Sequence, residues 1–309
     1  MLSSAPAIAQ VLNSYGIGAS EVAAACGISR YRSQFALWLE KTGRRPAFAG
    51  NLHTRLGQLC EPHARQLYAN ATGLDVEIPR ESIYHPTIPW ARCTPDGLIL
   101  PRTSRRGMQI KCVGYFVGRR FKYELPIEYE AQVQWEMFVC DLDSIDLAVL
   151  VGSDELLWER FILGEAIDPS AIFASSMLEV YTIHRSEAAI ASLHAGAAKF
   201  WAMVQADEQP PIDGSPEAAS YFNSKVRKDG VTIAESECQE DIDAYRAAVL
   251  ADKNATKALD TAKNRVRAAM TAAGANRITT ADGPIDLRID RRGVVSLHAP
   301  KGWAKDEIQ

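Results

Sequence analysis

The sequence predicts an α+β protein, in which a mixed central sheet flanked by helices is followed by a C-terminal extension of helix and small β structure. Of the 309 residues, 47% are hydrophobic and 23% are charged, which is typical of a soluble globular protein with a full core. Helical and strand-like spacings alternate in the order helix, β-meander, helix and strands. A Pro-rich, acidic stretch at 206–217 then separates this part from a segment of different composition.

The first elements are three helices. Residues 16–29 predict a turn and a short helix with Ser20 as its N-cap. Residues 33–46 predict an amphipathic helix that ends before a glycine and a proline. Residues 51–73 predict a core helix that ends at a glycine C-cap and carries Glu61. The residues expected on the buried face of this helix are Leu56, Leu59, His63, Leu67 and Tyr68.

Short β-type runs and a second helical region come next. The β-type runs are 74–79, 82–91, 96–101 and 108–114. Residues 126–143 return to helical spacing, and 144–152 and 156–163 alternate like two strands joined by a turn. A helix over roughly 185–206 completes this part. The order predicts helices packed against a mixed sheet.

The chain is expected to divide into a domain at 1–207, a linker at 208–235 and an extension at 236–309. In the extension, residues 236–274 predict a long helix or a helical hairpin. The tail that follows predicts a β-meander with turns at Asp282-Gly283 and Arg292-Gly293.

Composition excludes several classes of protein. No apolar run is long enough for a membrane span, and the N-terminus has no secretory pattern, so we expect a cytoplasmic protein. The six cysteines form no C-x-x-C pair, which argues against zinc ribbons and iron–sulfur clasps.

One basic stretch stands out in a chain of net charge −4. Between Gly97 and Tyr123 there is no acidic residue, although the stretch carries many cations. A local field of one sign attracts phosphate groups, whereas the plain alternative is a solvated loop with chance arginines. The cations are Arg102, Arg105, Arg106, Lys111, Arg119, Arg120 and Lys122.

The residues that point to chemistry lie on a predicted hairpin. Asp96 falls in its first turn, and Gln109 and Lys111 share one face of its second strand because strand side chains alternate. Phosphodiester hydrolysis needs oxygen ligands for a divalent cation and a positive group for the charge that develops in the transition state. The spacing alone is weak, since a charged β-turn would give the same pattern.

Companion motifs strengthen the hairpin. Glu61 lies on a preceding helix, from which it could reach the same metal. Tyr129 and Gln132 share a face of the following helix. In order along the chain, "GASEVAAACG", "LGQLCEPHAR", "TPDG", "QIKC" and "YEAQVQWEM" resemble the YqaJ / phage lambda exonuclease family of PD-(D/E)XK nucleases. The resemblance covers about residues 14–165 and implies a restriction-endonuclease-like sheet.

The resemblance also implies roles for individual residues. Asp96 would be the central metal ligand, Glu61 a further carboxylate ligand, and the Ile110 carbonyl an additional one. Lys111 would be the lysine of the D/E-x-K element. Tyr129 and Gln132 would orient water or DNA near the scissile phosphate. The implied cofactor is Mg²⁺, with two ions bound and Mn²⁺ as a substitute.

The expected DNA contacts come from several elements. Ser20 would contact a 5′-phosphate or the backbone from a helix N-terminus, which agrees with the helix dipole. Arg30 and Arg32 would meet phosphates or simply cap a helix. The remaining expected contacts are Arg105, Arg106, Arg119, Arg120 and Lys122. Members of the family digest duplex DNA from a 5′ end, and several form trimers and work beside a single-strand annealing protein in phage recombination.

Gln109 departs from the family pattern, which has Glu at this position. At an effective dielectric of about 20, a charge pair near 4 Å is worth roughly 4 kcal/mol, or about a thousandfold in affinity or rate. The chain could be an engineered Glu→Gln variant, a natural nuclease that works with Gln, or a natural binder that does not cut. The functions in competition are an impaired 5′→3′ exonuclease, a non-cleaving DNA-end or partner-binding module, an endonuclease of the same fold, and an unrelated α/β protein.

Overall fold

The computed structural model describes residues 15–46, 48, 50–121, 123–152, 160, 163, 165, 176–226, 236, 238–281, 283–289, 292 and 295–299. The chain divides into two compact units, residues 1–226 and 227–309. The predicted α+β class is confirmed, because a mixed sheet with helices forms the first unit and a long helix with a small sheet forms the second.

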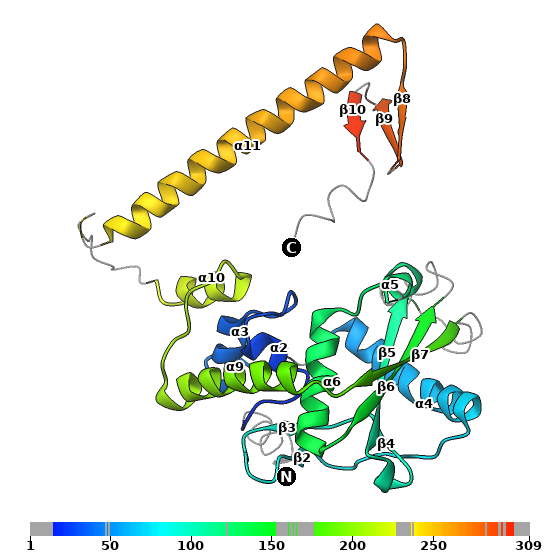
Figure 1. Ribbon diagram of the computed structural model, residues 1–309. Helices are drawn as coiled ribbons and strands as arrows, with labels where there is room; N and C mark the ends of the chain where they lie inside the picture. Colours follow the sequence, from blue (N-terminus) through cyan, green and yellow to red (C-terminus); the bar gives the residue numbers. More distant parts are fainter. Residues whose placement is uncertain are drawn as a thin grey trace. The chain divides into compact units, whose positions relative to one another are not determined.

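A five-stranded sheet is the centre of the first unit (Figure 1). Its order is β1-β4-β5-β6-β7, and only the central pair β5–β6 is parallel. The strands are β1 (Val76–Glu77), β4 (Gly97–Ile99), β5 (Arg106–Gly114), β6 (Ser144–Gly152) and β7 (Ser176–His184). A two-stranded hairpin of β2 (Ile83–Tyr84) and β3 (Arg92–Cys93) lies beside it. The helices α5 (Tyr115–Arg120) and α6 (Ile127–Cys140) connect β5 to β6, as a parallel pair requires.

Both faces of this sheet are covered by helices. On one face, Met108 and Ile110 of β5 belong to a core cluster with Leu56 of α4 (Leu52–Thr72). On the other face, Val113 belongs to a cluster with Val133 of α6. Because successive strand residues point to opposite faces, the even-numbered side chains of β5 face α4 and the odd-numbered ones face α6.

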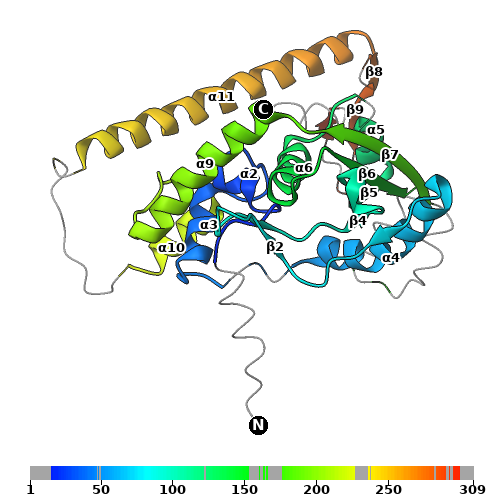
Figure 2. The same ribbon diagram turned by 60° about the horizontal axis from the view of Figure 1, so that its bottom comes forward.

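A group of helices packs on the far side of α6 (Figure 2). It consists of α2 (Val22–Ala25), α3 (Gln34–Lys41) and α9 (Glu187–Ala206), whose apolar residues form one core with Trp135 of α6. The position predicted for the N-cap of α2 is wrong. The helix begins at Val22, the N-cap is Glu21, and the exposed Ser20 lies in the preceding turn. The Glu21 carboxylate accepts the N–H of Gly18 at 2.8 Å, and so holds that turn.

The helix α4 has the predicted ends but a different buried face. Asn51 caps its start through a capping box, and Gly73 closes it with φ +69°. The predicted face included Leu59, which is half exposed, whereas the helix buries residues four apart: Leu56, Cys60, Ala64 and Tyr68. Four-residue spacing along a helix keeps side chains on one side.

Several elements of the first unit were not predicted from the sequence, among them the helix α5, the strand β7 and one further helix. The strand β7 pairs with β6 from Ser144↔His184 to Gly152↔Ser176. The strand predicted at 156–163 as the partner of β6 lies mostly outside the described residues. The helix α10 (Pro216–Asn223) falls within the stretch 208–235 predicted as a linker. It packs on α3, where the centres of the Phe35 and Tyr221 rings lie 6.0 Å apart.

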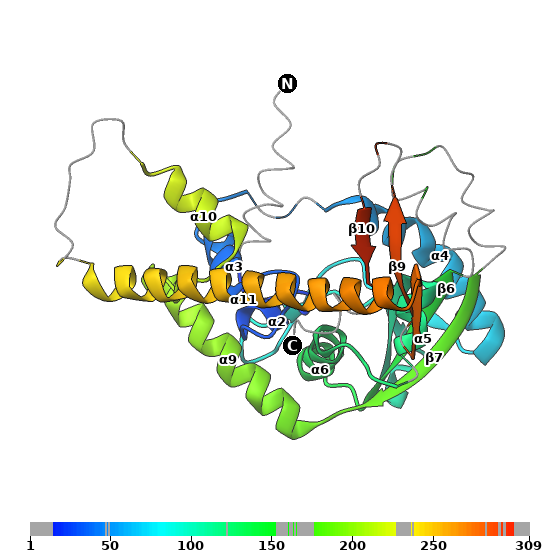
Figure 3. The same ribbon diagram turned by 90° about the horizontal axis from the view of Figure 1, so that it is seen from above.

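The second unit contains one long helix, α11 (Gln239–Ala272), followed by a three-stranded antiparallel sheet (Figure 3). The strands are β8 (Arg277–Thr280), β9 (Gly283–Ile289) and β10 (Val295–His298), in the order β10-β9-β8. Of the two predicted alternatives, a single helix is therefore the one formed. No helix among the described residues is both long and apolar enough to cross a membrane.

Candidate nuclease site

The hairpin residues meet at the edge of β5. The Oδ2 atom of Asp96 accepts the backbone N–H of Ile110 at 2.7 Å and the Nε2 amide of Gln109 at 2.5 Å. This arrangement is possible because β4 pairs with β5 only at Gly97↔Met108 and Leu98↔Gly107. The backbone N–H of Ile110, just beyond this pairing, is therefore available to Asp96. A side chain on Gly97 would place its Cβ 2.2 Å from Val76, so glycine is required there.

The lysine on this strand is held by α6. The Nζ atom of Lys111 donates to Oε1 of Gln132 at 2.7 Å and lies 4.9 Å from the centre of the Tyr129 ring. Burial lowers the pKa of Lys111, while the charge of Asp96 acts in the opposite direction. The sequence predicted the shared face of Tyr129 and Gln132, and the structure places that face over the strand.

Two side chains of α4 complete the electrostatic surroundings of Asp96. Burial, and next the charge of Asp96, raise the pKa of Glu61. Burial likewise raises the pKa of Asp96. Arg65, one helical turn after Glu61, donates from Nη2 to the carbonyl oxygen of Asp96 at 3.4 Å, and its buried Nε has no hydrogen-bond partner. The sequence reasoning missed Arg65, although four-residue spacing from Glu61 would have signalled it.

A second missed residue is Glu136 of α6. Its side chain is 0% exposed, and its Oε1 accepts the Nε2 amide of Gln132 at 3.0 Å. Burial, and next the charge of Asp96, raise the pKa of Glu136 well above its ordinary value. Four-residue spacing from Gln132 is the signal that could have found it.

The donor atoms around Asp96 suit a hard divalent cation in kind. They are carboxylate oxygens of Asp96 and Glu61, the Ile110 carbonyl, and the buried Oε1 of Gln109, which has no hydrogen-bond partner. Among the described residues, however, no three His, Cys, Asp or Glu side chains are arranged to hold a metal ion. A 180° rotation of the Gln109 side-chain amide would place Oε1 instead of Nε2 beside Asp96. An oxygen that can bind a cation would then replace a hydrogen-bond donor.

Of the three predicted DNA contacts at the start of the chain, the two arginines pair with acids. Ser20 is exposed in its turn. Arg30 pairs with Glu128 of α6 at 3.4 Å, and Arg32 pairs with Glu40 at 3.1 Å. Their roles toward DNA stay predictions.

The basic stretch after Gly97 does not lie together. Arg105 pairs with Asp141 and Asp143, and Arg106 pairs with Asp146 at 2.7 Å, all at the start of β5. Arg119 and Arg120 lie on α5, beyond the other end of the strand, and Lys122 falls outside the described residues. The cations of the stretch are therefore spread along the strand, since Arg102 pairs with Glu77 at 3.0 Å and Lys111 belongs to the candidate site.

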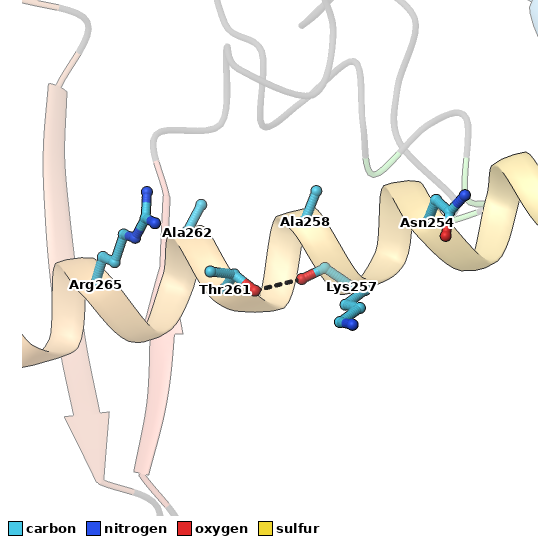
Figure 4. Close-up of a pocket in the computed structure, with 6 residues that line it drawn as sticks. All are labelled: Asn254, Lys257, Ala258, Thr261, Ala262 and Arg265. Carbon is cyan, nitrogen blue, oxygen red and sulfur yellow. Dashed lines mark hydrogen bonds between the residues drawn. The ribbon is translucent and has the colours of Figure 1, made fainter.

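A surface hollow of about 510 Å³ lies along α11 in the second unit (Figure 4). Its lining comes from one helix, and Thr261 donates its hydroxyl to the Lys257 carbonyl at 2.8 Å there. The lining residues are Asn254, Lys257, Ala258, Thr261, Ala262 and Arg265. None of the site residues described above belongs to it.

Comparison with known proteins supports the resemblance seen in the motifs. Residues 12–143 match the family model of the YqaJ-like viral recombinase domain. The chain is 22% identical over 215 residues to the uncharacterized protein YqaJ of Bacillus subtilis, a match that covers 68% of this chain and 60% of that protein. The chain thus spans less than two thirds of the length of this curated relative. The resemblance predicted from the five motifs is confirmed for this domain.

Solved structures of two exonucleases are also similar to the chain. An alkaline exonuclease from Laribacter hongkongensis is 20% identical, with a TM-score of 0.49 over 71% of this chain and 100% of that one. A phage-related exonuclease from Haemophilus somnus 129PT is 16% identical, with a TM-score of 0.46 over 62% of this chain and 96% of that one.

Proposed function

Taking the YqaJ-like viral recombinase domain at residues 12–143 as the premise, we propose that the chain is a Mg²⁺-dependent 5′→3′ exonuclease of double-stranded DNA in phage-type homologous recombination. We propose further that Gln109 lowers its activity. The observation that carries the proposal is the meeting of Asp96, Gln109 and Lys111 at one strand edge, with Gln132 bonded to the lysine.

The residues that would hold Mg²⁺ are Asp96, Glu61, the Ile110 carbonyl and Oε1 of Gln109. We propose that two ions bind there, as the family resemblance implies, and that Mn²⁺ can replace Mg²⁺ because it prefers the same oxygen ligands. When bound, the cation supplies a Lewis acid that neutralises charge on the phosphate. The amide of Gln109 brings an oxygen but no charge, so cation binding is weaker than with Glu.

The lysine and its helix partners would act on the phosphate. Lys111 places a positive charge beside Asp96, where it stabilises negative charge that develops on phosphate oxygens. Gln132 fixes the position of Lys111 through the 2.7 Å hydrogen bond, and the Tyr129 ring excludes water from one side of the ammonium group. Both contacts reduce the movement of Lys111 before the reaction.

The family premise also supports the partners that we propose. They are a DNA duplex with a 5′ end, further copies of the chain in a trimer, and a single-strand annealing protein in the cytoplasm of a bacterial or phage-infected cell. The proposed phosphate contacts are Ser20, Arg30, Arg32, Arg105, Arg106, Arg119, Arg120 and Lys122. Light scattering of the full chain tests the trimer directly.

A second function is favoured by one specific observation. In the structure, the Gln109 amide donates to the Asp96 carboxylate, so it occupies an oxygen that a cation would need. A module that holds DNA ends without cutting them would have this arrangement. An endonuclease of the same fold is distinguished by its ability to cut covalently closed circles.

The decisive experiment changes Gln109→Glu. We expect Mg²⁺-dependent release of nucleotides from linear duplexes to rise by up to about a thousandfold, because a charge pair of roughly 4 kcal/mol is restored. Duplexes with and without a 5′ phosphate report the end preference.

The matched control is Gln134→Glu. Like Gln109, Gln134 is buried, but it lies on α6. Its amide donates to the His184 carbonyl and accepts the N–H of Ser186. This change adds a carboxylate away from Asp96, so it should lower stability without raising nuclease activity. Intact DNA binding with no gain of cleavage in Gln109→Glu would favour the binding module instead.

A further inference from the structure

Glu136 is a buried acid that the proposed reaction has not yet used. It is 0% exposed on α6, and its Oε2 atom has no hydrogen-bond partner. A buried carboxylate is costly unless charge or hydrogen bonds compensate it. Glu128, a buried acid on the same helix, also has an Oε2 atom without a hydrogen-bond partner, but its Oε1 accepts the backbone N–H of Arg30 at 2.9 Å and pairs with the Arg30 guanidinium at 3.4 Å.

The surroundings of Glu136 belong to the candidate site. The charges of Asp96 and Lys111 both act on it, the first raising its pKa and the second lowering it. In turn, the charge of Glu136 acts with that of Asp96 to raise the pKa of Lys111 against the effect of burial. The Oε2 atom of Glu136 therefore lies within the electrostatic field of Asp96 and Lys111, where a divalent cation would bind.

A chain of hydrogen bonds joins Glu136 to the lysine. The Nε2 atom of Gln132 donates to Glu136 at 3.0 Å, and the Oε1 atom of Gln132 accepts from Lys111 at 2.7 Å. A side-chain amide has its donor on one atom and its acceptor on the other. An acceptor at position 136 therefore keeps the oxygen of Gln132 turned toward Lys111, and the opposite amide orientation would lose both bonds.

We propose that Glu136 is a positioning residue that supplies, from α6, the buried carboxylate that β5 lacks at Gln109. This inference rests on the proposed function. Glu136 sets the orientation of Gln132 and thereby of Lys111, and in its ionised form its charge balances the lysine and favours a divalent cation beside Asp96. An acid at position 109 would provide the charge from the strand, whereas this chain provides it from the helix.

The test moves the charge between the two positions in the full chain. Glu136→Gln keeps the shape and an acceptor oxygen but removes the charge, so we expect Mn²⁺ affinity of the DNA-free protein to fall roughly tenfold, because one negative charge is lost near Asp96. The double change Gln109→Glu with Glu136→Gln returns the charge to the strand, and should restore affinity to within about threefold of the parent. Isothermal titration with Mn²⁺ measures both.

Activity provides a second measurement. Glu136→Gln should lower kcat by about tenfold with little change in KM for DNA, because Glu136 does not touch the substrate. Glu136→Leu, which also removes the acceptor for Gln132, should lower kcat further. Thermal melting shows that each variant is folded.

The control is Asp146→Asn on β6, which removes a buried carboxylate outside the site and should leave Mn²⁺ affinity at the parent value. The inference is overturned if Glu136→Gln binds Mn²⁺ as the parent does, if the double change stays as weak as Glu136→Gln, or if the parent binds no Mn²⁺. Should no variant release nucleotides, the exonuclease proposal fails, whereas the Mn²⁺ affinities still decide the role of Glu136.

Discussion

Two buried acids of the first unit have opposite surroundings. Asp146 on β6 is 2% exposed and accepts three hydrogen bonds: from the Tyr68 hydroxyl at 2.5 Å, from Arg106 at 2.7 Å and from the Thr182 hydroxyl at 2.8 Å. Glu136 on α6 is more buried still, yet one of its oxygens has no hydrogen-bond partner.

The difference extends to the groups around each acid. In the candidate site, the buried Oε1 of Gln109 and Nε of Arg65 have no hydrogen-bond partner either. A fully bonded polar cluster stabilises the fold, whereas buried polar atoms without partners leave donors and acceptors that a ligand could use. We therefore call the residues around Asp146 the structural cluster, and those around Asp96, for which we propose a catalytic role, the functional cluster.

The largest expected effect is on the functional cluster. Asp96→Asn, made together with Gln109→Glu so that activity is measurable, should lower the rate of nucleotide release by roughly a thousandfold, because the central charge beside the cation is lost. Stability of the metal-free protein should not fall, since burial already disfavours this charge and raises the pKa of Asp96. Nuclease assays and thermal melting measure the two effects. A large loss of stability would mean that Asp96 is structural.

The structural cluster should respond in the reverse way. Asp146→Asn removes a charge that accepts a hydrogen bond from Arg106, and we expect a loss of about 2 kcal/mol in the free energy of unfolding. Nuclease activity of the folded protein should be unchanged. Urea denaturation and nucleotide release, followed on the same samples, compare the two. A loss of activity at full stability would remove the distinction between the clusters.

Much of this architecture follows from sequence patterns. The capped helices α3 and α4 and the strands β5 and β6 have strong local periodicity, so their types could be predicted. The alternation of side chains also placed Gln109 and Lys111 on one face of β5. By contrast, β7 was missed because its apolar residues fall on both faces of the strand, as Leu178 and Tyr181 do, and so give no strict alternation in the sequence.

The site was predictable only where a motif marked it. Arg65 and Glu136 lie inside the motifs "LGQLCEPHAR" and "YEAQVQWEM" but were given no role, because their importance comes from tertiary packing that brings α4 and α6 to the same strand edge. The basic stretch after Gly97 shows the reverse error. It forms one run in the sequence, but β5 separates Arg105 and Arg106 at its start from Arg119 and Arg120 beyond its end.

A change of pH should affect the functional cluster. The pKa values of Asp96, Glu61 and Glu136 are raised, mainly by burial. A carboxyl with a raised folded pKa holds its proton more tightly in the folded state, so its stabilising effect is complete below the unfolded pKa and is lost as pH rises through the folded pKa. Melting of the metal-free protein should therefore occur at lower temperature as pH rises from about 5 to about 8.

The cation should reverse this trend. Mn²⁺ displaces the protons from the carboxylates, so its affinity should increase over the same range, and added Mn²⁺ should flatten the decline in melting temperature. Asp96→Asn removes one of the titrating groups and should make the decline shallower without Mn²⁺. An equally steep decline in this variant would show that other groups of the protein cause it.

The smallest expected effect concerns Arg105, a proposed DNA contact beside the structural cluster. DNA affinity of the parent should fall steeply with salt, with a slope of about −0.9 per neutralised phosphate on logarithmic axes. Arg105 already pairs at 3.0 Å with both Asp141 and Asp143, so it must leave these acids to meet a phosphate. Arg105→Gln should therefore change DNA affinity less than about threefold, and the slope by well under the roughly 0.9 expected for one phosphate. Fluorescence anisotropy with a labelled duplex measures both quantities. A decrease of about 0.9 in the slope of this variant would show that Arg105 leaves the two aspartates and binds a phosphate. The DNA-binding surface would then extend to the start of β5, beside the structural cluster.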